Sequence, residues 1–176
     1  MIKPENCIVL MIDMQEKLVK ATNADNEVKQ AEKLIKTAEI LDIPTLVSEQ
    51  YPKGLGYTVD CLKNNKQKYF EKTHFSVLKE DDFSEILKNY DKKQIILFGI
   101  EAHICVYQTA MDLLERGYEV YFVKDLSKSR SEYEFNTGTE LMKQEGVKIT
   151  CLEIVLFELL KSSKNPHFKE IQNLIK

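Results

Sequence analysis

The stretch KQIILFGIEAHICVYQTAMDLLERG, residues 93–117, decides the fold. Its first part, residues 93–100, is a nearly continuous apolar run, which is typical of a strand buried on both faces of a parallel sheet. In its second part, apolar residues recur at helical spacing from Tyr107 to Leu114, and Gly117 ends the helix. A buried strand that passes directly into a helix is typical of α/β proteins with a parallel sheet.

The same alternation extends over the rest of the chain. Apolar runs predict six strands, within residues 7–12, 45–48, 68–77 (ending near Lys72), 93–100, 118–125 and 147–154. Helical periodicity and end signals predict helices over residues 28–41, 81–90, 107–117, 131–146, 155–160 and from Pro166 to the end of the chain. We therefore expect a doubly wound α/β fold: a mostly parallel, six-stranded, Rossmann-like sheet with helices on both faces, in three layers.

Composition limits the class of protein. With 176 residues, 43% of them apolar, the chain can bury one sizeable core, so we expect a single domain over residues 1–176. The net charge is −3 and opposite charges are interleaved, which argues against nucleic acid as a partner. No apolar run approaches the ~18 residues of a membrane span. We therefore expect a cytoplasmic protein. The four cysteines lack zinc-ligand or disulfide spacing, so neither a zinc site nor a disulfide framework is indicated, and we expect no cofactor.

Three strand ends carry side chains with chemistry. Asp13 follows the first predicted strand, Lys72 ends the third, and Cys105 lies at the start of the helix after the fourth. In open α/β sheets, ligands bind beyond the carboxyl ends of the strands, so these groups can meet in one cleft. A thiol is the strongest nucleophile of the three, and a helix N-terminus, an ammonium and a carboxylate base can all activate it. We therefore expect the sulfur of Cys105 to be ionised in the free protein.

Each of the three residues also has an ordinary interpretation. A single cysteine is most often a small buried hydrophobic residue, Asp13 could cap the next segment, and Lys72 could simply be solvated. Only their joint placement at the same edge of the sheet argues for a site.

The segments that carry these residues resemble the isochorismatase-like cysteine hydrolases, a family that includes nicotinamidases and N-carbamoyl amidases. The resemblance runs through IVLMIDMQEKL, TLVSEQYPKGLG, FEKTHFS, LFGIEAHICVYQTAMDLLERGYEVYFVKDLSKSRS, VLFELL and PHFKEIQNLIK. It implies a catalytic triad of Asp13, Lys72 and Cys105 and a thioester intermediate. It also implies a cis peptide bond at Ile100–Glu101, with an oxyanion hole formed by the amides of Glu101 and Cys105.

The chain also departs from parts of this family. Nicotinamidases carry an Asp-x-His metal motif where this chain has Glu49-Gln50-Tyr51, which contains no imidazole, so we expect no catalytic metal. Isochorismatases that cleave a vinyl ether lack the cysteine. The presence of Cys105 therefore favours a metal-independent hydrolase of a small amide, carbamoyl or ester substrate. The alternative is a non-catalytic protein that retains the fold and binds small molecules or acts as a scaffold.

Several other residues are weaker candidates. Gln15, Tyr51 and Phe75 are candidates for the substrate pocket, although a turn role for Gln15 and ordinary packing of the two aromatic rings are open alternatives. His103 invites a Cys–His dyad, but Asp13 is the better candidate base. Arg130 could reach an anionic substrate group or could be a surface charge at the start of a helix. The apolar VLFELL segment and the last helix favour a homo-oligomer, although both could equally pack on the sheet.

Overall fold

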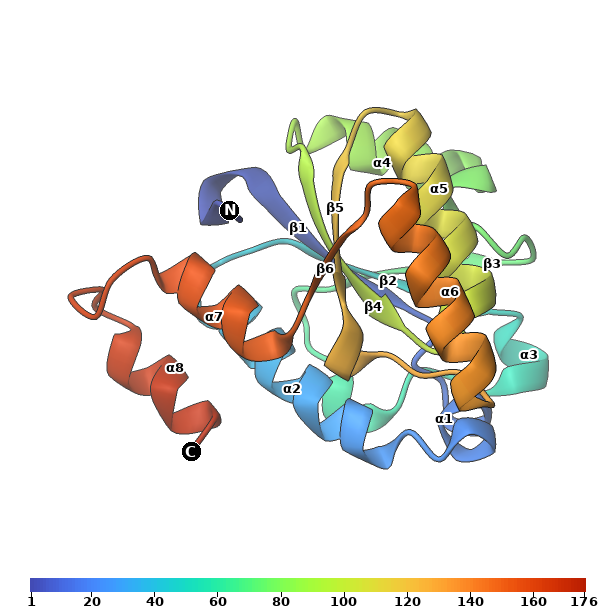
Figure 1. Ribbon diagram of the computed structural model, residues 1–176, viewed down its shortest axis with the longest axis horizontal. Coiled ribbons are helices and arrows are strands. Elements are labelled where there is room, and N and C mark those ends of the chain that lie inside the picture. Colours follow the sequence, from blue (N-terminus) through green and yellow to red (C-terminus); the bar gives the residue numbers. More distant parts are fainter.

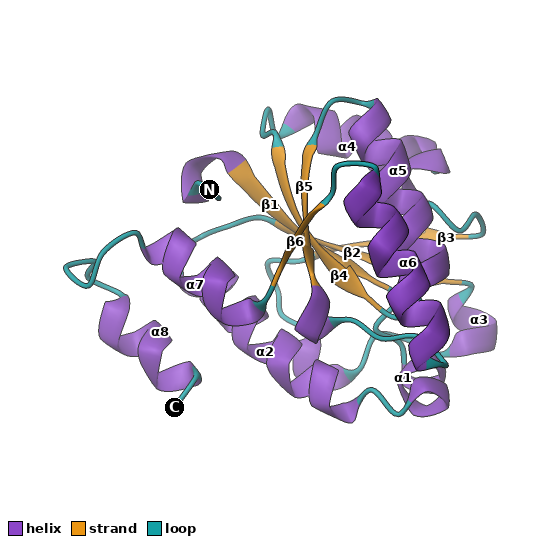
Figure 2. Ribbon diagram, in the orientation of Figure 1, coloured by secondary structure: helices purple, strands orange, loops and turns teal.

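The computed structural model describes all residues, 1–176, and contains one six-stranded sheet in which every neighbouring pair of strands is parallel. The strand order is β3-β2-β1-β4-β5-β6. Figure 2 shows the strands in orange, fanned out behind β6. The strands are β1 (Cys7–Ile12), β2 (Thr45–Gln50), β3 (Lys68–Lys72), β4 (Gln94–Gly99), β5 (Glu119–Val123) and β6 (Lys148–Thr150). This confirms the predicted doubly wound α/β fold.

Helices cover both faces of the sheet, as Figure 1 shows. They are α1 (Glu16–Thr22), α2 (Asp25–Ile40), α3 (Pro52–Leu55), α4 (Asp81–Asn89), α5 (Tyr107–Glu115), α6 (Glu132–Gln144), α7 (Leu152–Leu160) and α8 (Phe168–Leu174). One face packs against α2 and α7, and the other against α4, α5 and α6. None of these helices is long and apolar enough to cross a bilayer.

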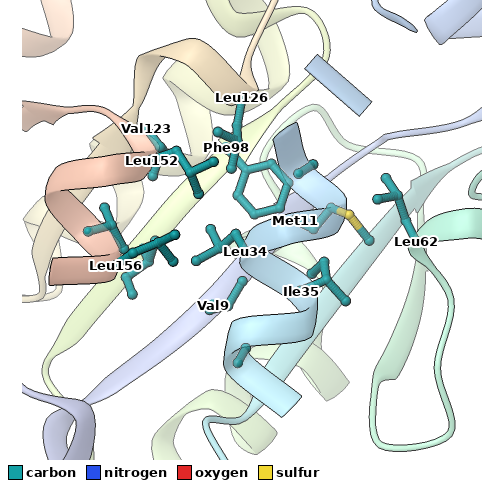
Figure 3. Close-up of a cluster of buried hydrophobic side chains, with 14 of the residues drawn as sticks. Val9, Met11, Leu34, Ile35, Leu62, Phe98, Val123, Leu126, Leu152 and Leu156 are labelled. Atoms are coloured by element: carbon teal, nitrogen blue, oxygen red, sulfur yellow. The ribbon is translucent and has the colours of Figure 1, made fainter. Parts of the chain in front are cut away.

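Two hydrophobic cores lie on the two faces of the sheet. One contains 27 buried residues between the sheet and α2 with α7, including Met11, Leu34 and Leu156 (Figure 3). The other contains 21 buried residues and receives the alternate side chains of β1, such as Leu10. All six side chains of β1 are buried, which explains why this strand is continuously apolar rather than alternating.

The predicted start of α6 is confirmed in detail. Ser131 is its N-cap residue, and its hydroxyl oxygen accepts a hydrogen bond from the backbone N–H of Glu134 at 3.3 Å. The Ser131 hydroxyl also donates to the Glu134 carboxylate at 2.9 Å, so the pair fixes the first turn of the helix.

The sixth strand was predicted too long. It ends at Thr150, and α7 begins at Leu152, because the carboxylate of Asp125 accepts a hydrogen bond at 2.9 Å from the backbone N–H of Leu152. This contact satisfies a first-turn amide of α7 from a residue 27 positions away, which local sequence patterns cannot reveal. The short helix α1 was also missed, since its polar sequence buries only Val19 and Thr22.

Candidate active site

The site lies at the carboxyl edge of the sheet between β1 and β4, where the strand order reverses. Asp13 follows β1, Lys72 is the last residue of β3, and Cys105 lies in a π-helical turn, Ala102–Val106, after β4. Gly99 lets the ends of β1 and β4 come close together, because a Cβ atom there would lie only 2.1 Å from the carbonyl oxygen of Ile12. The fold therefore brings the three predicted side chains to one place.

Asp13 and Lys72 form a fully buried ion pair. The Nζ of Lys72 lies 2.7 Å from Oδ2 of Asp13, and both side chains are 0% exposed. The hydroxyl of Ser48 donates to Oδ1 of Asp13 at 2.7 Å. Lys72 also donates to Oε1 of Gln50 at 2.5 Å and to the carbonyl oxygen of His74 at 3.4 Å. Both carboxylate oxygens and the ammonium thus have partners, as buried charges require.

Burial raises the pKa of the Asp13 carboxyl above its usual value. The ammonium of Lys72 and the hydrogen bonds from Lys72 and Ser48 oppose this increase. A carboxylate with a raised pKa is a stronger base than an exposed one, so Asp13 is suited to accept a proton.

Cys105 is 6% exposed, and its Sγ lies 4.0 Å from Oε1 of Gln50. Burial raises the pKa of its thiol to about 12; the charge of Asp13 raises this pKa further, and the charge of Lys72 lowers it. The expectation that the sulfur is ionised in the free protein is therefore wrong. The sequence indicated a nearby ammonium, but it did not show how deeply the sulfur is buried or that Asp13 already neutralises this ammonium.

The turn that leads to Cys105 differs from the one implied by the family resemblance. The structure contains no cis peptide bond, so the expected cis bond at Ile100–Glu101 is wrong. The chain turns instead through a left-handed conformation at Glu101, with φ 57°. The carboxylate of Glu101 is held by Nε of Arg130 at 2.8 Å, and its carbonyl oxygen accepts from the backbone N–H of Ile104 at 2.9 Å. These contacts hold the turn in this conformation without a cis bond.

Arg130 thus has a role that neither of its two sequence interpretations included. It forms an ion pair with Glu101 beside the turn. His103 lies in the same turn, where its Nδ1 is 2.9 Å from the hydroxyl of Ser129 and 3.4 Å from the Glu101 carboxylate. These side chains fix the turn that carries Cys105.

Gln15 binds the backbone at the end of β2 and in the loop that follows it. Its Oε1 accepts from the backbone N–H of Gln50 at 2.7 Å, and its Nε2 donates to the carbonyl oxygens of Gln50 at 3.0 Å and Gly56 at 2.6 Å. Gln15 is fully buried, so its amide is committed to these backbone groups and holds the end of β2 in place. The sequence left two roles open for Gln15, lining the pocket or a role in a turn, and these hydrogen bonds to Gln50 and Gly56 favour the second.

Sequence reasoning missed Ser48 and Gln50. Both lie on β2 two positions apart, so their side chains project from the same face of the strand, toward Asp13 and Lys72. The available signal was the polar end of this strand, Ser48-Glu49-Gln50, whose first and third side chains must project from the same face. Gln50 is notable because its Oε1 contacts both the ammonium of Lys72 and the sulfur of Cys105.

The two aromatic pocket candidates lie at the surface. Tyr51 and Phe75 are both exposed, and Tyr51 lines a cavity of about 190 Å³ together with Lys72 and Thr73. The backbone N–H of Tyr51 donates to the carbonyl oxygen of Lys72 at 3.0 Å. Tyr51 therefore lies beside the ion pair, whereas nothing in the structure ties Phe75 to it. No group of three or more His, Cys, Asp or Glu side chains is arranged to hold a metal ion.

An all-parallel sheet of order 3-2-1-4-5-6 with eight helices defines an isochorismatase-like α/β fold. The sequence model of the isochorismatase domain family matches residues 7–154, and the chain belongs to this family. It is 42% identical over 169 residues to "Isochorismatase domain-containing protein 2" of Danio rerio, which covers 96% of this chain and 86% of the relative.

Solved structures agree with this assignment. The structure of a MAR1 ribonuclease from Caenorhabditis elegans superimposes with a TM-score of 0.92 at 40% identity, covering 99% of this chain and 91% of that one. The YcaC gene product of Escherichia coli, described as an octameric hydrolase of unknown specificity, has a TM-score of 0.90 at 23% identity and covers 99% and 94%. At this lower identity the second similarity shows the fold alone.

Proposed function

We propose that this protein is a metal-independent cysteine hydrolase of a small amide, carbamoyl or ester substrate, acting through a thioester acyl-enzyme. One observation carries the proposal: the Cys105 thiol lies in a buried site with the Asp13–Lys72 ion pair, which influences the pKa of that thiol. A nucleophile next to a base that is oriented by a third group is the general arrangement of covalent hydrolases.

In the first step, Asp13 acts as the general base. The pKa of about 12 means that Cys105 enters the reaction as a neutral thiol. Its proton passes to Asp13 while Sγ forms a bond to the substrate carbonyl carbon and the carbonyl oxygen becomes an oxyanion. The site holds Asp⁻, Lys⁺ and a thiol before the step, and AspH, Lys⁺ and an oxyanion after it. Its net charge is unchanged, which matters because an uncompensated charge in a buried site is costly.

The second step releases the leaving group and then the acid. Collapse of the oxyanion breaks the bond to the amine or alcohol, which departs with the proton held by Asp13. Water then attacks the thioester carbon and gives a proton to Asp13. The carbon–sulfur bond breaks, the acid leaves, and Asp13 returns that proton to the sulfur of Cys105. We assign the oxyanion site to the backbone N–H groups of Glu101 and Cys105. The N–H of Glu101 donates a hydrogen bond to no other group of the protein. Removing one such donor typically costs about 3–4 kcal/mol of transition-state stabilisation.

The residues around the thiol argue for chemistry without a metal. Where nicotinamidases have an Asp-x-His metal motif, this chain has Glu49-Gln50-Tyr51, and Oε1 of the middle residue, Gln50, is bound to the ammonium of Lys72. A cation held at this oxygen would face that ammonium at close range, and the stretch 49–51 offers no imidazole.

A substrate panel tests the proposal. Wild type, Cys105→Ala and Cys61→Ala are assayed against small amides, carbamoyl compounds and esters, with intact-protein mass measured after rapid quenching. We expect turnover and an acyl adduct on wild type and on Cys61→Ala, whose thiol is exposed and far along the chain, and neither on Cys105→Ala. Turnover that survives Cys105→Ala would refute the mechanism. No Cys105-dependent turnover on any substrate would favour a non-catalytic binding or scaffold protein.

A second candidate activity comes from the Caenorhabditis elegans relative, whose description names a ribonuclease. We expect no RNA cleavage, because the reacting side chains are almost fully buried and a polynucleotide cannot reach them in this conformation. An RNA oligonucleotide in the same panel tests this. Cleavage lost in Cys105→Ala would assign the site to phosphodiesters.

A further inference from the structure

A second cavity lies on the other face of β2 from the site described above. Successive side chains of a strand project from opposite faces, so Glu49, between Ser48 and Gln50, projects away from Asp13 and Lys72. There it helps to line a cavity of about 420 Å³. The other lining residues are Tyr57, Lys63, Asn64, Asn65 and Tyr69.

Glu49 is a buried carboxylate without a cation. Glu49 is only 5% exposed. Its Oε1 accepts hydrogen bonds from the backbone N–H and the hydroxyl of Thr58, both at 2.7 Å. Its other oxygen, Oε2, accepts no hydrogen bond and makes no ion pair, and it is not one of the fully buried polar atoms that lack a partner. Oε2 is therefore open to the cavity, where a positively charged group can pair with it.

Lys63 is the only cationic side chain of the cavity wall, and another carboxylate holds it. Its Nζ lies 2.8 Å from Oδ1 of Asp60, and it makes no ion pair with Glu49. Glu49 therefore has no direct ion pair, and its charge acts on the ammonium of Lys63 only at longer range.

The two tyrosines supply aromatic surface next to this charge. Burial, and then the charge of Glu49, raise the pKa of Tyr69 to about 12, so the phenol is within the electrostatic reach of the carboxylate. Tyr57 comes from the loop after β2, and that loop is fixed: the carbonyl oxygen of Tyr57 accepts from the N–H of Glu16 at 3.0 Å, and the N–H of Val59 donates to Met14 at 3.0 Å. The walls are thus formed before any ligand binds.

We propose that this cavity binds an organic ammonium ion, with the cationic group between Oε2 of Glu49 and the rings of Tyr57 and Tyr69. Aromatic rings beside a carboxylate are the typical surroundings of alkylammonium ligands, since the ring faces attract positive charge. A divalent metal fits less well. Calcium requires six to eight oxygen ligands and magnesium a near-ideal octahedron, whereas Glu49 is the only carboxylate in this cavity wall.

Binding of choline as a probe tests the proposal. Backbone amide chemical shifts of the ¹⁵N-labelled protein are followed during titration with choline chloride, and separately with its neutral carbon analogue, in which a tert-butyl group replaces the trimethylammonium. We expect saturable shifts at Thr58 and at residues 63–69 with choline only. Glu49→Gln, which keeps the acceptor oxygen for Thr58, should weaken binding at least tenfold, whereas Glu140→Gln on the exposed side of α6 should not.

Tyr69→Leu provides a second variant that keeps apolar bulk but removes the aromatic ring, and it should weaken choline binding several-fold. The amide spectrum of each variant reports whether it is folded. Equal affinity for choline and its neutral analogue, unchanged binding by Glu49→Gln, or no saturable shift at millimolar choline would each overturn the proposal.

Discussion

The ammonium of Lys72 lies 2.7 Å from the carboxylate of Asp13, and neither side chain is exposed to solvent. The pair joins the end of the edge strand β3 to the end of the central strand β1, across β2. A buried pair of this kind contributes little net stability over apolar residues of similar size, because desolvation offsets most of the attraction. The proposed mechanism gives it another role: on that mechanism the pair keeps a base and a cation next to the sulfur of Cys105.

Breaking this pair should destabilise the protein strongly. Lys72→Met removes the cation and leaves Asp13 buried with Ser48 as its remaining side-chain partner. We expect the free energy of unfolding to fall by about 3–5 kcal/mol, measured by urea denaturation. The double variant Asp13→Asn, Lys72→Met should lose less than the sum of the two single losses, because no charge is then left buried. Additive losses would contradict the coupling of the two residues.

Cys105 should alkylate slowly despite its proposed role as nucleophile. A pKa raised from 9.0 to about 12 lowers the thiolate fraction near neutral pH by about a thousandfold, and the sulfur is also shielded from solvent. Iodoacetamide labelling near pH 7, followed by peptide mass spectrometry, should modify the exposed Cys61 before Cys105. If Cys105 reacted first, its thiol would be ionised in the resting protein and the proton transfer to Asp13 would not be needed.

Stability should fall at alkaline pH in part because of the buried thiols. Burial raises the pKa of Cys7 from 9.0 to about 12, as it does for Cys105. Between these two values the unfolded chain has released protons that the folded chain still holds, so the free energy of unfolding decreases as pH rises. The stabilisation is complete below about pH 9 and is lost as pH approaches 12.

Cys7→Ala isolates one of these groups. Its urea denaturation, measured at several pH values above 9, should show a shallower decline than wild type, by up to about 1.4 kcal/mol per pH unit. The slope is compared rather than the absolute stability, since the smaller side chain also changes packing. Cys151→Ala, at a half-buried position before α7, is the matched control. A slope for Cys7→Ala equal to that of wild type would show that Cys7 does not contribute.

The sequence was sufficient to predict the sheet and the proximity of three residues that lie far apart in the chain, for a physical reason. Continuous apolar runs mark strands buried on both faces, and parallel strands present their carboxyl ends at one edge. Asp13, Lys72 and Cys105 each lie at or just beyond such an end, so topology alone brings them together.

The protonation state of the site could not be obtained in the same way. It depends on how deeply Cys105 is buried and on which charge lies nearest to it, and both are properties of the packed structure. The cis bond after β4 was expected from the family resemblance alone, and the structure has instead a left-handed residue, Glu101, which pairs with Arg130, 29 positions away in the chain. Local sequence patterns do not reveal partners that lie so far apart in the chain.

Gln15 should control the order of the loop after β2. Gln15→Leu keeps the volume of the side chain but leaves the N–H and carbonyl groups of Gln50 and the carbonyl of Gly56 without their present partner. Each unsatisfied buried group typically costs about 1–3 kcal/mol, so we expect lower stability and faster amide hydrogen exchange at residues 50–58. Unchanged exchange in that loop would show that the three hydrogen bonds do not hold it.

A substitution at Gly138 should displace Cys105 without changing Cys105 itself. This residue of α6 packs against the π-helical turn, where an added Cβ would lie 2.7 Å from Cα of His103. Gly138→Ala must therefore displace backbone, at a cost of about 1–3 kcal/mol that the better helix propensity of alanine offsets by about 1 kcal/mol. The net loss of stability should be small, but the amide shifts of residues 101–106 and the alkylation rate of Cys105 should change.

Asn136→Ala on the exposed side of the same helix is the control, because it has the propensity gain without the clash. The amide shifts of residues 101–106 and the alkylation rate of Cys105 should be the same in this variant as in wild type. If Gly138→Ala also left the shifts of residues 101–106 unaltered, the turn would tolerate displacement of α6, and the position of Cys105 would depend on its contacts with β4 and with Arg130–Glu101 alone. A change confined to Gly138→Ala instead identifies the packing of α6 as the constraint that holds the sulfur beside Gln50 and the ion pair.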